Sequence, residues 1–277
     1  ATNMLPSFQT VSFKSGSGQL TLRGWMIAPK EGLNRGTVIL VHDQGKNRLP
    51  FGLDSNPLIK LLSREGFYIL AFDQRHSGDS DGGMSSFGYA EADDVLAALR
   101  YASSNNPKQP LLLYGFGTGN LAIFRALEML DKESGEDPEA ARVLEQIGAL
   151  LTDSPARSSE SYIRAAIRQE GKHWMFWLEE TTPYAIRLSI SRSENKDYFT
   201  SFSSMPLPVL VFGHEEDSQL LAADYKPMIT ERLRLMPERT MTCILPGQGH
   251  LTSYQDGREV YLEALTDFFE RFFPLAG

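Results

Sequence analysis

The segment LLLYGFGTGNLAIFR, residues 111–125, decides how the rest of the chain is organised. Its first four residues are an apolar run short enough for a buried strand. Three glycines follow within the turn at 115–119, and apolar residues then recur at helical spacing from Leu121 onward. The segment therefore predicts a strand, a tight turn and a helix, in that order.

A strand, a tight glycine turn and a helix form the structural context of the nucleophile elbow, G-x-S-x-G. Such a turn is strained, and its small flanking residues let it lift the middle side chain above the edge of a sheet. The middle residue here is Gly117, which stands where the pattern has serine. Gly117 has no side chain with which to attack a substrate.

Strands and helices alternate along most of the remaining chain. Apolar runs predict strands at residues 8–14, 19–28, 36–41, 67–72, 148–152, 208–212 and 240–245, and helical spacing predicts helices at 56–65, 89–103, 140–146, 222–236 and 258–273, with a charged loop at 131–139. The first two strands read as an antiparallel hairpin. The alternation after residue 36 predicts a mostly parallel, doubly wound α/β sheet with right-handed crossovers.

Residues 156–205 interrupt this alternation with helical pieces rich in aromatic residues and with Ser- and Arg-rich loops. We therefore expect a core made of residues 1–155 and 206–277 and a helical cap insertion at 156–205. The length of 277 residues and the apolar content of 42% suit one α/β domain with such an insertion.

Composition excludes several classes of function. The formal charge of −8 is spread along the chain without Lys or Arg clusters, which argues against a nucleic-acid partner. The lone cysteine, Cys243, excludes an internal disulfide and a cysteine-based metal cluster. No apolar run reaches the 18 residues typical of a membrane span. The chain begins at Ala1 rather than Met, which leaves open both a cytoplasmic protein and an exported one with a trimmed signal or anchor.

Polar motifs follow several of the predicted strands, at the edge of the sheet where ligands bind in doubly wound folds. His42-Asp-Gln-Gly follows the strand at 36–41, and a loop there can direct a backbone N–H at a developing oxyanion, although an ordinary polar turn is about as common. Acids that can orient an imidazole end the strand at 208–212, and a glycine-flanked His250 follows the strand at 240–245. The order elbow, acid and histidine is that of one particular catalytic triad.

These motifs together resemble the α/β-hydrolase superfamily, and within it the lysophospholipase and monoglyceride-lipase-like esterases, over nearly the whole chain. His42-Asp-Gln-Gly resembles the H-G-x-G oxyanion loop with Asp43 in place of glycine, residues 73–80 resemble D-x-R-G-x-G-x-S with His76 in place of glycine, and residues 245–250 match the histidine motif. The resemblance implies an α/β-hydrolase fold, with Gly117 at the nucleophile position, His250 as base and Asp217 as its orienting acid. Glu216 remains the alternative acid.

The resemblance also implies the surroundings of the site. The backbone N–H groups of Asp43 or Gln44 and of Thr118 would form the oxyanion hole, while the Thr118 side chain should point away from the pocket. We expect His42, Trp174 and Trp177 to line the substrate pocket; packing of the cap is the other explanation for the two tryptophans. No metal or organic cofactor is implied, because the sequence has no His-x-x-x-His pair, dinucleotide fingerprint or phosphate loop.

Gly117 leaves three hypotheses open. The first is a serine hydrolase for small or lipid-like esters whose nucleophile has been replaced, so that the chain is inactive as written. The second is a natural pseudoenzyme, a ligand-binding or scaffold protein that keeps the pocket; Asp43 and His76, both departures from glycine, favour this kind of divergence. The third is an enzyme in which His250 activates a water molecule or a substrate proton directly. The first is our prediction and the second its main alternative.

Overall fold

The computed structural model describes residues 5–16, 18–30, 32–170, 177–191 and 194–275. Within these residues, eight strands form one sheet in the order β1-β2-β4-β3-β5-β6-β7-β8. The first strand pairs antiparallel with the second, the second pairs antiparallel with β4, and the other neighbours are parallel. The predicted N-terminal hairpin and the mostly parallel sheet are therefore confirmed.

The strands lie close to the positions that the apolar runs predict. They are β1 (Phe8–Lys14), β2 (Thr21–Ile27), β3 (Gly36–Val41), β4 (Phe67–Asp73), β5 (Leu111–Phe116), β6 (Ile147–Asp153), β7 (Val209–Glu216) and β8 (Thr240–Gln248). The parallel strands β3 and β5 lie in the middle of the sheet, so the elbow segment occupies the centre of the fold.

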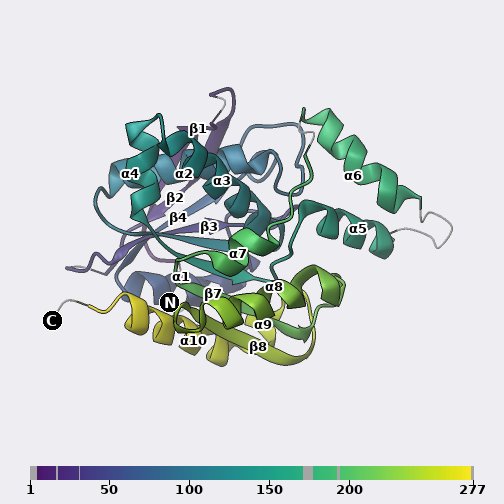
Figure 1. Ribbon diagram of the computed structural model, residues 1–277. Coiled ribbons are helices and arrows are strands. Elements are labelled where there is room, and N and C mark those ends of the chain that lie inside the picture. The colour runs from purple at the N-terminus through teal and green to yellow at the C-terminus, as the bar shows by residue number, and fades with distance from the viewer. Residues whose placement is uncertain (1–4, 17, 31, 171–176, 192–193, 276–277) are drawn as a thin grey trace.

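Helices cover both faces of the sheet (Figure 1). One face carries α2 (Glu91–Asn105), α3 (Thr118–Ser134) and α4 (Pro138–Gln146), and the other carries α1 (Ser55–Arg64), α9 (Ser253–Asp256) and α10 (Arg258–Phe272). The remaining helices are α5 (Ser159–Glu170), α6 (Leu178–Ser189), α7 (Phe199–Ser204) and α8 (Ala222–Leu235).

The central strands are apolar on both sides because each side faces a layer of helices. In β3, Ile39 and Val41 join the apolar core on the side of α2 and α3, whereas Val38 and Leu40 join the core on the side of α1 and α10. All four side chains are buried. A continuous apolar run is therefore the expected sequence for this strand. The strand ends at Val41, and the loop that carries Asp43 begins directly after it.

The predicted charged loop at residues 131–139 is wrong over most of its length. Helix α3 continues to Ser134, and α4 begins at Pro138, so only three residues separate the two helices. The charged residues lie on the outer side of the helices, where a helical backbone tolerates them. Asp137 caps α4, since its Oδ1 accepts the Glu139 N–H at 2.9 Å.

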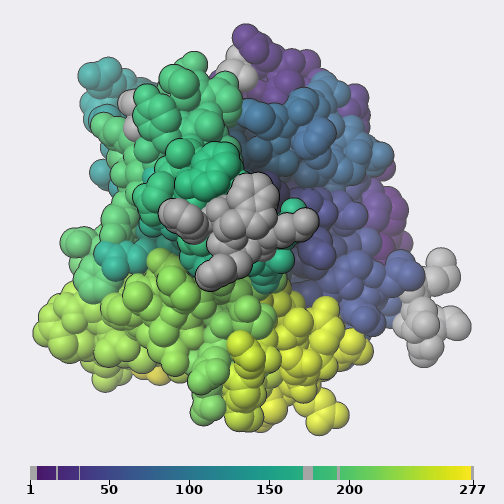
Figure 2. Space-filling view, turned by 90° about the vertical axis from the view of Figure 1, so that its right-hand side faces the viewer, coloured from purple at the N-terminus to yellow at the C-terminus, as the bar shows by residue number. Residues whose placement is uncertain are grey.

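The segment expected to be a cap contains α5, α6 and α7. Helices α5 and α6 project to one side of the sheet in Figure 1, and Figure 2 looks onto that side, where green cap residues lie above the yellow-green C-terminal part. Helix α7 instead packs against α8, with Phe202 fully buried beside Phe124 of α3. The division into core and cap remains a prediction, because α5, through Tyr162 and Ala165, and α7, through Phe202, both join the apolar core on the side of α2 and α3.

Candidate active site

The elbow turn joins β5 to α3 at the centre of the sheet. Gly117 has φ +52° and ψ −121°, a left-handed conformation that glycine adopts far more readily than any residue with a Cβ. Its N–H donates to the Asp153 carbonyl at 3.1 Å, and its carbonyl accepts the backbone N–H and the side-chain amide of Asn120 at 3.1 and 3.0 Å. A Cβ at Gly119 would lie 2.2 Å from the Val41 carbonyl, so the helix can approach β3 this closely only with glycine there.

The structure brings Asp217 and His250 together. Nδ1 of His250 lies 2.7 Å from Oδ2 of Asp217, and only 4% and 6% of the two side chains are exposed. The other carboxylate oxygen of Asp217 accepts the N–H groups of Gln219 and Leu220, both at 2.8 Å, which fixes the acid in its turn after β7. Glu216 is exposed, so the geometry favours Asp217 over Glu216 as the partner of His250.

Several charges act on the imidazole of His250. Burial alone would lower its pKa, but the hydrogen bond to Asp217 and the negative charges of Asp217, Asp43 and Asp153 together raise the pKa above the ordinary value of 6.5. When the ring is neutral, its Nδ1–H donates to Asp217 and its Nε2 is left as a hydrogen-bond acceptor. This is the tautomer that a general base requires.

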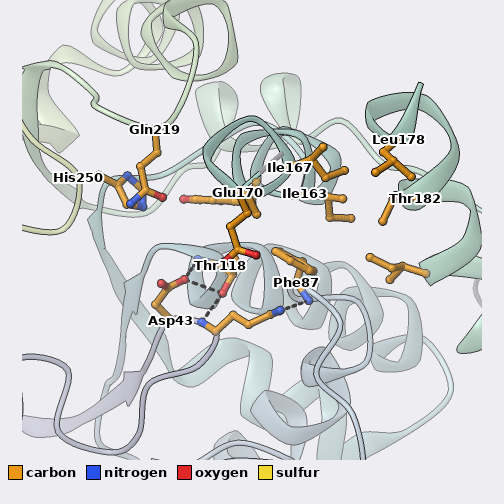
Figure 3. A pocket seen from close by; sticks show the side chains of 14 residues that line it. Asp43, Phe87, Thr118, Ile163, Ile167, Glu170, Leu178, Thr182, Gln219 and His250 are labelled. Carbon is orange, nitrogen blue, oxygen red and sulfur yellow. Dashed lines mark hydrogen bonds between the residues drawn. The ribbon is translucent and has the colours of Figure 1, made fainter. Parts of the chain in front are cut away.

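The Asp43 side chain occupies the place that a serine side chain at position 117 would need. A Cβ built on Gly117 would lie 2.4 Å from Oδ1 of Asp43 and 2.7 Å from its Cγ. The carboxylate is held there by Thr118, whose backbone N–H and hydroxyl both donate to Oδ1, at 2.9 and 2.8 Å (Figure 3). Because Gly117 has no side chain, the Asp43 carboxylate can fill the space beside it.

Of the three backbone N–H groups considered for the oxyanion hole, those of Gln44 and Thr118 are engaged within the protein. The Thr118 N–H donates to Asp43, and the Gln44 N–H donates to the Thr118 hydroxyl at 2.8 Å. The expectation that the Thr118 side chain points away from the pocket is wrong, because this side chain lines the cavity and contacts Asp43. In this conformation no substrate oxygen can accept from either N–H group without displacing Asp43 or Thr118.

A cavity of about 620 Å³ opens beside His250, between the elbow and the cap helices. Its polar side includes Asp43, Thr118 and His250, and its apolar side comes largely from α5 and α6 (Figure 3). The residues that line it are Asp43, Gln44, Phe87, Thr118, Tyr162, Ile163, Ala166, Ile167, Glu170, Leu178, Thr182, Ile186, Gln219 and His250. A second cavity of about 500 Å³ shares Asp43, Gln219 and His250 and extends toward Lys46 and Gln255.

Two of the three residues predicted to line the substrate pocket, His42 and Trp177, do not line the cavity beside His250. His42 is buried, its Nδ1 lies 2.7 Å from the Asp43 carbonyl, and its Nε2 accepts the Gln74 N–H at 3.0 Å. Burial lowers the pKa of His42, in keeping with a neutral ring that braces the loop. Trp177 is half exposed and does not line the cavity either, whereas the next residue, Leu178, does. Trp174 lies outside the described residues.

Reasoning from the sequence missed a buried network beneath His250. Asp153, at the end of β6, is fully buried and accepts hydrogen bonds from the hydroxyls of Ser154, Ser253 and Tyr261, at 3.0 to 3.1 Å. The Ser154 hydroxyl also accepts the N–H of Leu251, the residue after His250, at 3.1 Å. The network therefore ties the histidine loop to the centre of the sheet. Its only signal in the sequence is an acid at the end of an apolar strand.

The model of the alpha/beta hydrolase family matches residues 38–264, which include the elbow, Asp217 and His250. The chain belongs to the alpha/beta hydrolase family. It is 24% identical to the uncharacterised protein YfhR of Escherichia coli K12 over 275 residues, 95% of this chain and 80% of YfhR. The predicted α/β-hydrolase fold is thereby confirmed.

Solved structures of the same fold include several esterases. The chain is similar to the esterase Pf2001 of Pyrococcus furiosus, with a TM-score of 0.69 and 19% identity over 96% of this chain and 93% of that one. It is also similar to a thermophilic esterase from Thermogutta terrifontis, with a TM-score of 0.60 and 16% identity over 96% and 99% of the two chains. At such identities the likeness establishes the fold.

Neither a metal centre nor a membrane span is found in the described part of the chain. No three or more His, Cys, Asp or Glu side chains gather there in a way that could hold a metal ion. No helix among the described residues is both long and apolar enough to cross a bilayer.

Proposed function

We propose that this site descends from that of a serine esterase and now binds a small ligand with little or no turnover of esters. The observation that carries the proposal is the Asp43 carboxylate, which lies where a serine side chain at position 117 would lie and takes the Thr118 N–H as its own hydrogen-bond donor. An ester carbonyl would meet no nucleophile at position 117, and the N–H groups of Gln44 and Thr118 would not be free to donate to it. Loss of the nucleophile alone removes about six orders of magnitude of turnover in a serine protease.

The contact between positions 43 and 117 favours a natural pseudoenzyme over a hydrolase altered at a single position. If only the serine had been replaced, the rest of the site would still accommodate it. Here a side chain added at Gly117 would overlap the Asp43 carboxylate in its present position, and the carboxylate could make room only by leaving its two hydrogen bonds from Thr118; both positions thus depart from the esterase pattern in a mutually compatible way. The Asp217–His250 pair and the cavity support a ligand of the size of a small ester or acyl compound. The narrower likeness to lysophospholipases and monoglyceride lipases remains a prediction.

Hydrolysis of p-nitrophenyl acetate and p-nitrophenyl octanoate tests the proposal. The wild type, Gly117→Ser, Asp43→Gly and the double variant are compared, with His250→Ala in the wild-type and double-variant backgrounds as controls. We expect turnover by the double variant that depends on His250, less turnover by Gly117→Ser alone, and none above the His250→Ala background by the wild type. Removing Asp43 makes room for the serine and frees the Thr118 N–H.

Two results would count against the proposal. Turnover by the wild type that vanishes in His250→Ala would mean that His250 activates water directly and that the chain is an enzyme as written. Equal turnover by Gly117→Ser and the double variant would mean that Asp43 does not block the serine position.

A further inference from the structure

The hydrogen-bond donors around the elbow are consumed inside the protein. In the site of a serine esterase, backbone N–H groups at this place donate to an oxygen of the ligand. Here the Gln44 N–H donates to the Thr118 hydroxyl, and the Thr118 hydroxyl and N–H both donate to Oδ1 of Asp43. The N–H groups of Gln44 and Thr118 and the Thr118 hydroxyl therefore offer no donor to a ligand.

Two hydrogen-bond acceptors remain at the same place. Oδ2 of Asp43 has no hydrogen-bond donor among the described residues, and the atom is accessible from the cavity rather than enclosed in the protein interior. When the His250 ring is neutral, its Nε2 is likewise an acceptor that no described residue donates to, since Nδ1 donates to Asp217. Both residues line both cavities, so a ligand in either one meets an unpaired carboxylate oxygen and an imidazole acceptor.

The larger cavity also carries negative charge, as an acceptor site for a cation would. Its described lining contains the carboxylates of Asp43 and Glu170 and no Lys or Arg side chain, and its one imidazole, His250, is uncharged once the pH exceeds its pKa. The rings of Phe87 and Tyr162 also line it, and aromatic faces attract cations. Apolar side chains, among them Ile163, supply much of the remaining wall. The Gln219 amide can donate or accept, and the Gln44 amide, whose Oε1 accepts the Phe87 N–H at 2.7 Å, can donate; both are uncharged and do not alter this sign.

We propose that the ligand of this cavity is an organic ammonium ion with an apolar body. Its N–H groups donate to Oδ2 of Asp43 and Nε2 of His250, and its hydrocarbon part packs against the apolar wall of α5 and α6. The inference rests on the proposed ligand-binding function and adds the chemical class of the ligand. With aspartate where the esterase pattern has glycine, position 43 accepts hydrogen bonds from a cation at a place where that pattern donates them to an anion.

Isothermal titration calorimetry at pH 8 with three probes of equal chain length tests this proposal. Octylammonium, octanoate and 1-octanol share the apolar body and differ only in the head group. We expect the wild type to bind octylammonium about tenfold or more tighter than 1-octanol, and octanoate weakest, because a hydrogen bond to a charged group is worth at least that factor. Asp43→Asn should lose this preference and keep its affinity for 1-octanol, which shows that the cavity is intact.

Asp131→Asn is the matched control. Asp131 is exposed near the end of α3, so the variant removes one negative charge from the protein without touching the cavity. We expect its affinity for octylammonium to equal that of the wild type. Tighter binding of octanoate, unchanged octylammonium binding in Asp43→Asn, or no binding of any probe would each overturn the ammonium assignment. The hydrolysis of p-nitrophenyl esters tests the proposed loss of turnover separately, so its result does not depend on whether octylammonium binds.

Discussion

The mutual dependence of positions 43 and 117 can be measured as a coupling free energy. In the wild type, Gly117→Ala places a Cβ 2.4 Å from Oδ1 of Asp43, so the carboxylate must move and lose its two hydrogen bonds from Thr118. Hydrogen bonds to a charged group contribute about 1.5–3 kcal/mol each, and a partial return to water offsets part of the loss. A φ of +52° adds about 1–2 kcal/mol for a residue with a Cβ.

We therefore expect Gly117→Ala to reduce the free energy of unfolding by about 3–6 kcal/mol in the wild type and by about 1–2 kcal/mol in an Asp43→Ala background. The coupling between the two sites is then about 2–4 kcal/mol. Urea unfolding of the four proteins, analysed by linear extrapolation, measures it. A parallel cycle of Gly117→Ala with Asp131→Ala should be additive. Additivity within about 0.5 kcal/mol for the Asp43 cycle would refute the claim that the carboxylate fills the serine position.

Three further predictions concern the groups around the site. An NMR titration should give His250 a pKa above 6.5, and this pKa should decrease in Asp217→Asn. Because the folded-state pKa is raised, the stabilisation by the Asp217–His250 pair is full below pH 6.5 and is lost as the pH rises through the folded-state pKa. Equal differences in unfolding free energy between the wild type and Asp217→Asn at pH 6 and pH 9 would contradict this prediction. Replacing Asp153 by Ala leaves three buried hydroxyls without their acceptor and should cost about 3–5 kcal/mol in urea unfolding, with a smaller loss for Asn. Arg48→Met leaves the fully buried Asp73 carboxylate without its cation and should cost about 3–5 kcal/mol; a loss below about 1 kcal/mol would show that the pair does not stabilise the fold.

Much of the fold could be predicted from the sequence because the sheet is buried on both faces. Strands such as β3 and β5 must then be continuous apolar runs, and the helices between them must carry one apolar face. The ends of elements were less predictable. Helix α3 runs four residues into the expected loop, from Asp131 to Ser134, because charged residues are compatible with the outer face of a helix as well as with a loop.

The candidate site, like the fold, could be predicted from the sequence only in part. The pairing of Asp217 with His250 follows from their places after two adjacent parallel strands, β7 and β8, and from chain order. The position of the Asp43 side chain does not, because a resemblance to the oxyanion loop concerns only the backbone there. That the carboxylate enters the space left by Gly117 depends on the distance between two loops 74 residues apart, which no local pattern encodes.

Covalent labelling with a fluorophosphonate, read by intact-protein mass spectrometry, tests the central claim most directly. Such a probe reacts with a nucleophile that is activated by a neighbouring base. We expect no adduct on the wild type and one adduct on the Asp43→Gly/Gly117→Ser double variant, located at position 117 and lost when His250 is also replaced by Ala. An adduct on the wild type at Thr118, Ser154 or any other residue near the cavity would contradict the account, since it would show that the protein retains a working nucleophile.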